Sequence, residues 1–253
     1  MNAFSPRRTL VATAVALLAA TALVEAAPAR PPNLLFILAD DLGWADTTLN
    51  RPNAFYETPN LQRLAARGMR FTQAYSANPL CSPTRASILT GLYPARIGIT
   101  APVCHLPTVQ LEKNLAENEN GKTRVLVANS VTRLKPEYFT LAEAFKEAGY
   151  ATAHFGKWHL ARGYFPPQSL AEGPDQQGFQ EVLINHKPKS TDDPEQDAHG
   201  VEAITVRALD FLEHHRDRPF FLYLPHNTIH SPIMAPRALV AKHRARPGSD
   251  RPE

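Results

Sequence analysis

Two short, almost purely apolar runs set the strongest limit on what this chain can fold into. They are residues 33–39, Asn-Leu-Leu-Phe-Ile-Leu-Ala, and residues 220–224, Phe-Phe-Leu-Tyr-Leu. A strand with one face in water alternates apolar and polar side chains, whereas an unbroken apolar run is typical of a strand buried on both faces. The two runs therefore predict strands of a parallel sheet that is covered by helices.

Helical patterns and further strands fill the sequence between these runs. Turn and capping residues predict helices at residues 59–67, from Pro83 to Gly91, from the capping box at residues 140–143 to Gly149, and at residues 201–215. Further strands are predicted at residues 69–75 and 150–155, and long loops at residues 101–138 and 163–199. Strands that alternate with helices indicate an α/β fold with a mostly parallel sheet.

The size and charge of the chain exclude several classes of protein. It has 253 residues, of which 43% are hydrophobic, and a formal net charge of +3. This length allows a sizeable core, and it excludes a disordered chain, a collagen and a small disulfide scaffold. Because positive and negative charges nearly balance, we expect no nucleic-acid partner.

The first 26 residues have the pattern of an export signal. Arg7 and Arg8 precede an apolar run over residues 10–24, and small residues lead to a cleavage position after Ala26. A run of 15 residues is short for a transmembrane helix, which needs about 20. We therefore predict a cleaved signal peptide at residues 1–26, no stable membrane span, and an exported, periplasmic or secreted protein. A retained anchor is the alternative, and the paired arginines leave open the twin-arginine route.

Polar residues gather where the predicted strands end. Asp40 and Asp41 follow the first apolar run, Lys157 and His159 follow the strand at 150–155, and His230 lies shortly after the second run. Ligands of open α/β sheets bind beyond the carboxyl ends of the strands. These five residues are therefore candidates for a binding or catalytic site.

The adjacent carboxylates of Asp40 and Asp41 have two interpretations. Two neighbouring negative charges after a buried strand are costly unless a cation lies between them, and such oxygen ligands suit Ca²⁺ or Mg²⁺. Alternatively, they form a solvated turn in which one aspartate caps a backbone N–H. The residues alone leave both readings open.

Lys157, His159 and His230 are candidates to bind an anion or to transfer a proton. Lys157 and His159 are two positions apart, so in an extended segment both side chains point to one face. The alternative is that each histidine is a structural residue with satisfied hydrogen bonds. We place His154 in that second group, because it lies inside a predicted strand.

One segment carries a far more specific pattern than any of these residues. Residues 81–85, Cys-Ser-Pro-Thr-Arg, resemble the sulfatase signature Cys-x-Pro-Ser/Thr-Arg. The resemblance continues in order through residues 86–96, 32–43, 58–61, 156–159 and 230–232, and it covers roughly residues 31–240. The chain is thus identified as similar to the formylglycine-dependent sulfatases of the arylsulfatase and N-acetylgalactosamine-6-sulfatase type.

This resemblance implies both a fold and a chemistry. The fold is alkaline-phosphatase-like, with a central, mostly parallel mixed sheet between helices. The motif cysteine, here Cys81, is oxidised by a formylglycine-generating enzyme to an aldehyde that hydrates to a diol. One hydroxyl of the diol attacks sulfur and the alcohol leaves, which gives a covalent enzyme sulfate. The second hydroxyl then loses its proton and expels sulfate, which restores the aldehyde. The implied function is hydrolysis of sulfate esters of a small molecule or carbohydrate.

The resemblance also assigns roles to the candidate residues. Asp40, Asp41 and the modified Cys81 correspond to metal ligands, normally for Ca²⁺, with Mg²⁺ possible. Four further residues complete the catalytic set. Arg85 corresponds to the residue that holds the diol, and Lys157 to the residue that binds sulfate. His159 corresponds to the residue that assists elimination, and His230 to a candidate acid for the leaving oxygen.

The pattern departs from the family after His230. A second metal-binding pair and a second sulfate-binding lysine, which the family carries further on, have no counterpart here. We therefore interpret residues 27–253 as the N-terminal part of a sulfatase catalytic domain and expect weak or no activity from this chain alone. A phosphonate or phosphate monoester hydrolase and a non-catalytic remnant are the alternatives. A disulfide between Cys81 and Cys104, the two cysteines of the chain, would contradict the enzyme hypothesis.

Overall fold

The computed structural model describes most of the chain after the predicted signal peptide. The described residues are 30–52, 55–106, 129–161 and 172–248, together with three two-residue strands between 107 and 128. The chain divides into Met1–Pro32, of which only residues 30–32 are described, and a main unit, Asn33–Glu253. The predicted signal peptide lies outside the described residues.

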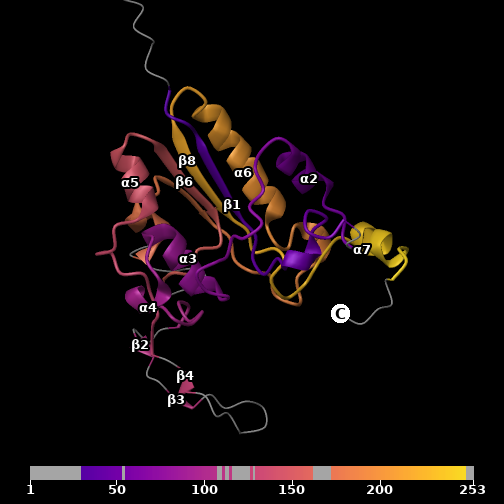
Figure 1. Cartoon of the computed structure of the whole chain (residues 1–253), viewed down its shortest axis with the longest axis horizontal. Coiled ribbons are helices and arrows are strands. Elements are labelled where there is room, and N and C mark those ends of the chain that lie inside the picture. Colours follow the sequence, from indigo (N-terminus) through magenta and orange to yellow (C-terminus); the bar gives the residue numbers. More distant parts are fainter. Residues whose placement is uncertain are drawn as a thin grey trace, which may run out of the picture. The chain divides into compact units, whose positions relative to one another are not determined.

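A four-stranded parallel sheet forms the centre of the main unit (Figure 1). Its strand order is β1-β8-β6-β7, and every neighbouring pair is parallel. The four strands are β1 (Leu34–Leu38), β8 (Phe220–Pro225), β6 (Ala151–Gly156) and β7 (Glu181–Ile184). The remaining strands, β2 (Gln110–Leu111), β3 (Asn114–Leu115), β4 (Leu126–Val127) and β5 (Ser130–Val131), form two small antiparallel pairs.

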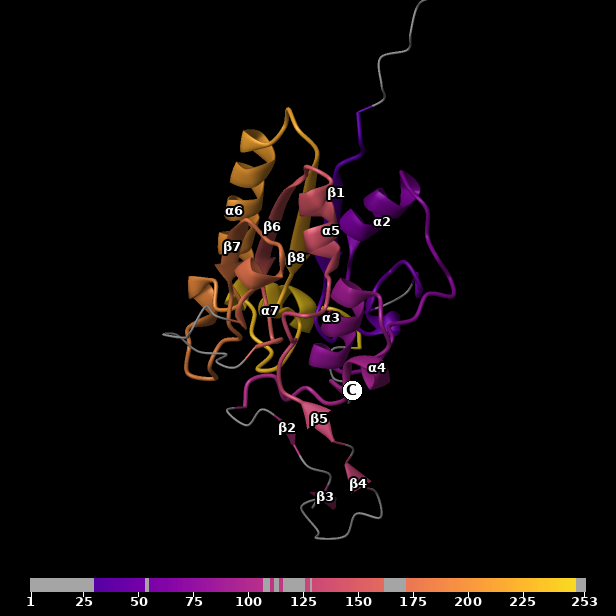
Figure 2. The ribbon, with the colours of Figure 1, turned by 90° about the vertical axis from the view of Figure 1, so that its left-hand side faces the viewer.

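Helices cover both faces of the sheet (Figure 2). The α-helices are α2 (Pro59–Ala66), α3 (Cys81–Thr90), α4 (Pro94–Ile97), α5 (Leu141–Glu147), α6 (Val201–His214) and α7 (Arg237–Arg244). Short 3-10 helices lie at η1 (Trp44–Asp46), η3 (Pro174–Gln177) and η4 (Pro194–Gln196). The predicted α/β class with a parallel sheet is confirmed.

Strand β8 shows why an unbroken apolar run forms a central strand. Phe221 and Tyr223 belong to a core cluster with residues of α3, α4 and α5, whereas Leu222 and Leu224 belong to a second cluster with residues of α6. Alternate side chains of β8 therefore enter two different cores, and the whole strand is buried.

Capping residues mark the start of α5 and the end of α3, as predicted. Thr140 and Glu143 form the reciprocal capping box of α5. Gly91 ends α3 with a φ of 68°, a conformation that glycine adopts without strain. The structure begins α3 at Cys81, two residues before the predicted start at Pro83.

Strand β1 is less buried than its apolar sequence predicts. Leu35 and Ile37 are 48% and 58% exposed, so the prediction of a strand covered on both faces is wrong for β1. The reason is its position, because β1 is the end strand in the order of this sheet and pairs with β8 on one side.

Three further predictions need correction. Residues 69–75 form no strand, and Met69, Phe71 and Tyr75 are each at least 75% exposed. The predicted loop at 163–199 contains the four-residue strand β7, which is too short for alternation of apolar and polar side chains to predict it. The sequence reading also missed α7 near the end of the described residues.

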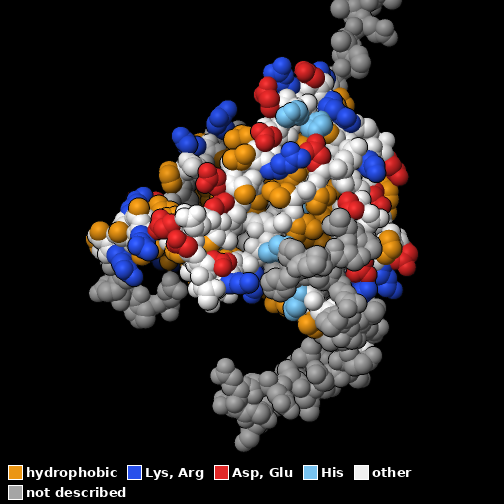
Figure 3. Space-filling view, turned by 180° about the vertical axis from the view of Figure 1, so that it is seen from behind, with side chains coloured by type: hydrophobic (Ala, Val, Ile, Leu, Met, Phe, Trp, Pro, Cys, Tyr) orange, Lys and Arg blue, Asp and Glu red, His pale blue; other side chains and the backbone are white. Residues whose placement is uncertain are grey.

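Two features of the described residues concern a nucleic-acid or membrane partner: the charge of the surface and the length of the helices. On the face drawn in Figure 3, basic and acidic side chains are interspersed. Within the described part of the chain, none of the helices has both the length and the apolar character needed to span a bilayer.

Candidate functional site

Asp40 occupies the position where β1 and β8 end. Its backbone N–H donates to the carbonyl of Thr228 at 2.8 Å, and its carbonyl accepts from Ile229 at 2.7 Å. The side chain is buried, with the residue only 5% exposed. The solvated-turn interpretation therefore does not describe Asp40, which is held rigidly at the carboxyl edge of the sheet as predicted.

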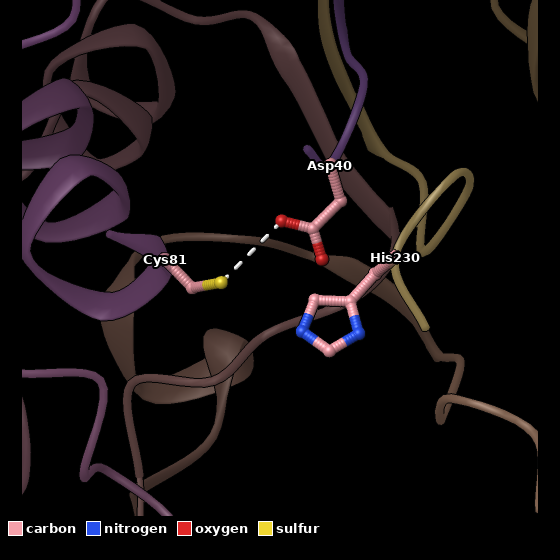
Figure 4. Close-up of side chains that lie close together, drawn as sticks. All are labelled: Asp40, Cys81 and His230. Atoms are coloured by element: carbon pink, nitrogen blue, oxygen red, sulfur yellow. Dashed lines mark hydrogen bonds between the residues drawn. The ribbon is translucent and has the colours of Figure 1, made fainter. Parts of the chain in front are cut away.

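Cys81 faces Asp40 from the first turn of α3 (Figure 4). Its Sγ lies 3.5 Å from Oδ1 of Asp40 and 3.5 Å from Nζ of Lys157. Burial raises the pKa of the Cys81 thiol, and the nearby cation of Lys157 opposes this rise only in part. At neutral pH the unmodified side chain is thus a thiol, which is a weaker nucleophile than a thiolate.

Arg85 links the helix to both neighbouring loops. It lies four residues after Cys81, on the same face of α3, and is 2% exposed. One guanidinium nitrogen lies 3.3 Å from Oδ1 of Asp40, and another donates to the carbonyl of Lys157 at 2.9 Å. The fixed fork of the guanidinium therefore sets the relative positions of all three residues.

Lys157 reaches the site because the chain turns sharply after β6. Gly156 has a φ of 140°, and a Cβ at this position would lie 2.0 Å from the carbonyl oxygen of Pro225. Only glycine permits this close approach, which lets the Lys157 N–H donate to the same carbonyl at 2.7 Å. The Lys157 ammonium then forms an ion pair with Oδ2 of Asp40.

The charges at this point favour an anion. Burial raises the pKa of Asp40, but the positive charges of Arg85 and Lys157 outweigh burial and hold it below its ordinary value. One buried carboxylate, that of Asp40, therefore faces two buried cations, while the exposed Asp41 carboxylate lies at the rim. A tetrahedral oxyanion is a class of ligand that paired buried cations attract.

His159 reaches the same region by a route that the sequence does not predict. Its φ is 53°, so the chain is not extended here and the argument from alternating side chains fails. Burial lowers the pKa of His159 to about 3, with the charges of Lys157 and His105 acting in the same direction. The ring is thus neutral at physiological pH, a state that can accept a proton.

His105 is a site residue that sequence reasoning missed. Its Nδ1 lies 3.2 Å from Nε2 of His159. The sequence offers no indication of this pairing, because His105 lies within the stretch at 101–138 that was predicted to be a loop, outside any strand or motif.

His230 completes the group around Asp40 (Figure 4). Asp40, Cys81 and His230 each place one possible ligand atom within 4.8 Å of the others. Asp41 is not one of these three residues: its carboxylate is more than half exposed, although it lies 3.8 Å from Nε2 of His230. The structure therefore brings Asp40, Cys81, Arg85, Lys157 and His230 together, and it leaves Asp41 at the rim.

Of the three possible ligand residues Asp40, Cys81 and His230, only Asp40 offers the carboxylate oxygens that a hard divalent cation prefers. The Lys157 ammonium contacts both Asp40 and the sulfur of Cys81, so a positive charge already occupies the space between them. Carboxylate oxygens are the ligands that Ca²⁺ and Mg²⁺ prefer, and an oxygen in place of the Cys81 sulfur would suit them better.

Two residues near the site, His154 and Cys104, are buried in the core. His154 is fully buried among the rings of Trp158, Phe179 and Tyr223, but neither of its ring nitrogens has a hydrogen-bond partner among the described residues, so the prediction of a satisfied structural histidine holds only for its burial. Cys104 is also fully buried, and burial raises its pKa to about 12. Cys81 and Cys104 are both free thiols, so they do not form the disulfide that would contradict the enzyme hypothesis.

Comparisons with known proteins agree on one family. The family profile named Sulfatase matches residues 32–251. N-acetylgalactosamine-6-sulfatase of Mus musculus is 33% identical over 87% of this chain and 44% of its own length. Arylsulfatase A of Homo sapiens is 38% identical over 71% of this chain and 28% of its own length. The chain thus spans less than half of the curated relatives it matches.

Solved structures give the same result for the fold. The crystal structure of Ps i-CgsB in complex with k-i-k-neocarrahexaose superposes with a TM-score of 0.63 and 26% identity, over 85% of this chain and 49% of that one. The structure of BT4656 in complex with its substrate D-glucosamine-2-N,6-O-disulfate superposes with a TM-score of 0.57 and 24% identity, over 85% and 38% of the two chains. The predicted alkaline-phosphatase-like fold is consistent with these neighbours.

Proposed function

The chain belongs to the sulfatase family, and we propose that the protein carrying it hydrolyses sulfate esters at the site around Cys81. The observation that carries this proposal is the meeting of Cys81, Asp40, Arg85 and Lys157, which come from α3 and from loops after two different strands. Buried cations beside a side chain that can become a nucleophile are what transfer of a sulfuryl group requires.

Cys81 acts in this proposal as formylglycine rather than as a thiol. The raised pKa of the thiol supports this step, because an unmodified Cys81 would be a poor nucleophile at neutral pH. One hydroxyl of the hydrated aldehyde is the oxygen nucleophile. The second hydroxyl, on the same carbon, expels sulfate when it loses its proton. A formylglycine-generating enzyme is therefore a required partner.

A divalent cation, Ca²⁺ or Mg²⁺, belongs to the same proposal. Asp40, Asp41 and the oxygen that replaces the Cys81 sulfur would hold it, with His230 close by. The cation would polarise the sulfate group and favour ionisation of the nucleophile. Its binding requires the Lys157 ammonium to move from Asp40 toward the sulfate.

The remaining side chains have separate tasks. Arg85 holds the nucleophile in place and offsets its charge, and Lys157 binds a sulfate oxygen. His159, whose ring is neutral, accepts a proton as sulfate is released. His230 lies on the other side of Asp40 and donates a proton to the leaving alcohol oxygen.

The proposed substrate is a sulfated carbohydrate. One relative acts, by its name, on the 6-sulfate of N-acetylgalactosamine, and one structural neighbour holds a neocarrahexaose. The protein is proposed to be exported, with residues 1–26 as its signal peptide, which agrees with a substrate outside the cell.

Hydrolysis of matched sulfate and phosphate esters of one phenol tests this function. The protein carrying this chain, produced together with a formylglycine-generating enzyme, should hydrolyse the sulfate faster. Cys81→Ala should lower kcat by about a thousandfold, whereas Cys104→Ala, which removes the other cysteine, should keep most of the activity. Faster hydrolysis of the phosphate would contradict the proposal.

We expect the isolated 253-residue chain to be a weak catalyst. Asp40, Asp41 and Cys81 are fewer ligands than the six to eight oxygens that Ca²⁺ takes. Strong turnover of an aryl sulfate by this chain alone would contradict this expectation and leave the assignment of Cys81 intact.

A further inference from the structure

A short segment after α4 brings a second imidazole to the site. Cys104 is fully buried in the core cluster beside α3, whereas the next residue, His105, is exposed. The exposed ring of His105 lies beside that of His159, which comes from the loop after β6.

The segment that carries His105 is tied down at its base. The buried hydroxyl of Ser130 accepts hydrogen bonds from the backbone N–H groups of Thr100 and Ala101, at 3.1 and 3.2 Å. A turn follows, in which the N–H of Leu106 donates to the carbonyl of Val103 at 3.0 Å. The position of His105 is therefore set by backbone contacts rather than by its own exposed ring.

Ser82 ties the segment that carries His159 to the start of α3. Its hydroxyl donates to the carbonyl of His159 at 2.8 Å. Ser82 is fully buried and adjoins Cys81 in the chain. One buried side chain thus fixes the backbone of His159 relative to the proposed nucleophile position.

The rings themselves meet through nitrogen atoms. Nδ1 of His105 lies 3.2 Å from Nε2 of His159, with ring centroids 5.5 Å apart and an angle of 35° between the rings. A hydrogen bond at this distance needs a proton on one nitrogen and a lone pair on the other. The tautomer of one ring is therefore coupled to that of its partner.

We propose that His105 is a positioning residue, whose Nδ1 holds Nε2 of His159 and so fixes the orientation and tautomer of that ring for its proton transfer. This inference rests on the proposed function of His159. Partners that fix a functional imidazole typically contribute about ten- to a hundredfold to activity.

Nuclear magnetic resonance of the histidine rings tests the pairing without any activity. The full chain, labelled with ¹⁵N-histidine, should show one dominant tautomer of His159. His105→Ala should shift the ring nitrogens of His159 toward a mixture, and His105→Asn, whose amide can bond at the same distance, should restore the original shifts. His214→Ala, at an exposed position on α6, is the control and should change nothing at His159. Identical His159 shifts in the wild type and in His105→Ala would overturn the pairing.

Steady-state kinetics of the protein carrying this chain test whether the pairing of His105 with His159 affects catalysis. His105→Ala should lower kcat for an aryl sulfate by about tenfold and leave KM within about threefold. His105→Asn should recover most of the loss. An unchanged kcat in His105→Ala would overturn the positioning role. A wild type without sulfatase activity would instead contradict the proposed function, and the ring shifts would still decide whether the two histidines are paired.

Discussion

The guanidinium of Arg85 lies 3.3 Å from the carboxylate of Asp40, and both side chains are almost fully buried, at 2% and 6% exposure. This ion pair joins α3 to the end of β1, two elements that carry the nucleophile position and the first candidate metal ligand. Because the same guanidinium bonds the backbone of Lys157, it also fixes the loop after β6.

Replacing Arg85 with alanine should therefore cost stability as well as activity. Removal of Arg85 leaves the buried Asp40 with Lys157 as its remaining buried ion-pair partner, and breaking a buried ion pair costs about 3 kcal/mol. Urea unfolding measures this loss. Arg216→Ala is the matched control, because Arg216 pairs with Glu213 at an exposed position and should change stability by less than about 0.5 kcal/mol. Equal losses in the two variants would show that the Arg85 pair is not structural.

Removal of the Asp40 carboxylate should weaken cation binding. Titration calorimetry with Ca²⁺ should show affinity reduced by at least about tenfold in Asp40→Asn. Asp210→Asn, on the exposed face of α6, should bind like the wild type. Chelation of the cation should likewise stop hydrolysis in the protein carrying this chain. Unchanged Ca²⁺ affinity in Asp40→Asn would remove Asp40 from the site.

His154 should make the folded chain sensitive to acid. Burial lowers its pKa from 6.5 to about 3 in the folded state, so between these values the unfolded chain binds the extra proton. Stability therefore falls as the pH falls below 6.5. From pH 7 to pH 5, His154→Phe should lose about 2 kcal/mol less than the wild type. Urea unfolding at both pH values measures this, with His214→Ala as a control that should follow the wild type. Equal losses in His154→Phe and the wild type would contradict a buried, neutral His154.

The two cores of the sheet should differ from the exposed end strand in their response to truncation. Leu222 in β8 is fully buried, and Leu222→Ala should cost about 2–5 kcal/mol. Ile37 in β1 is 58% exposed, and Ile37→Ala should cost less than about 1 kcal/mol. Comparable losses would mean that the outer side of β1 is covered in solution.

The sequence predicted the central strands and capped helices well because their signals are local. Residues 220–224 carry apolar side chains for two cores, and the Thr140 capping box needs only its own helix. The burial of β1 could not be predicted in this way. An apolar run is equally compatible with an end strand, and which strand lies beside it depends on the whole sheet.

In the candidate site, too, residues with a local sequence signal could be predicted, and residues placed by tertiary contacts could not. Motif residues such as Cys81 and Arg85 could be named from the sequence, because their spacing on one helix is itself the signal. His105 could not, because it lies 54 positions from His159 in the chain and meets it only in the tertiary structure. The left-handed backbone at His159 was equally hidden, since no residue type there demands it.

The central claim is that Cys81 is the precursor of the nucleophile, and mass spectrometry of one peptide tests it most directly. Trypsin should release residues 71–85 from the protein produced together with a formylglycine-generating enzyme. The account predicts a peptide about 18 Da lighter than its thiol form, as expected for conversion of the cysteine to an aldehyde. An intact Cys81, or a disulfide between Cys81 and Cys104, would contradict it.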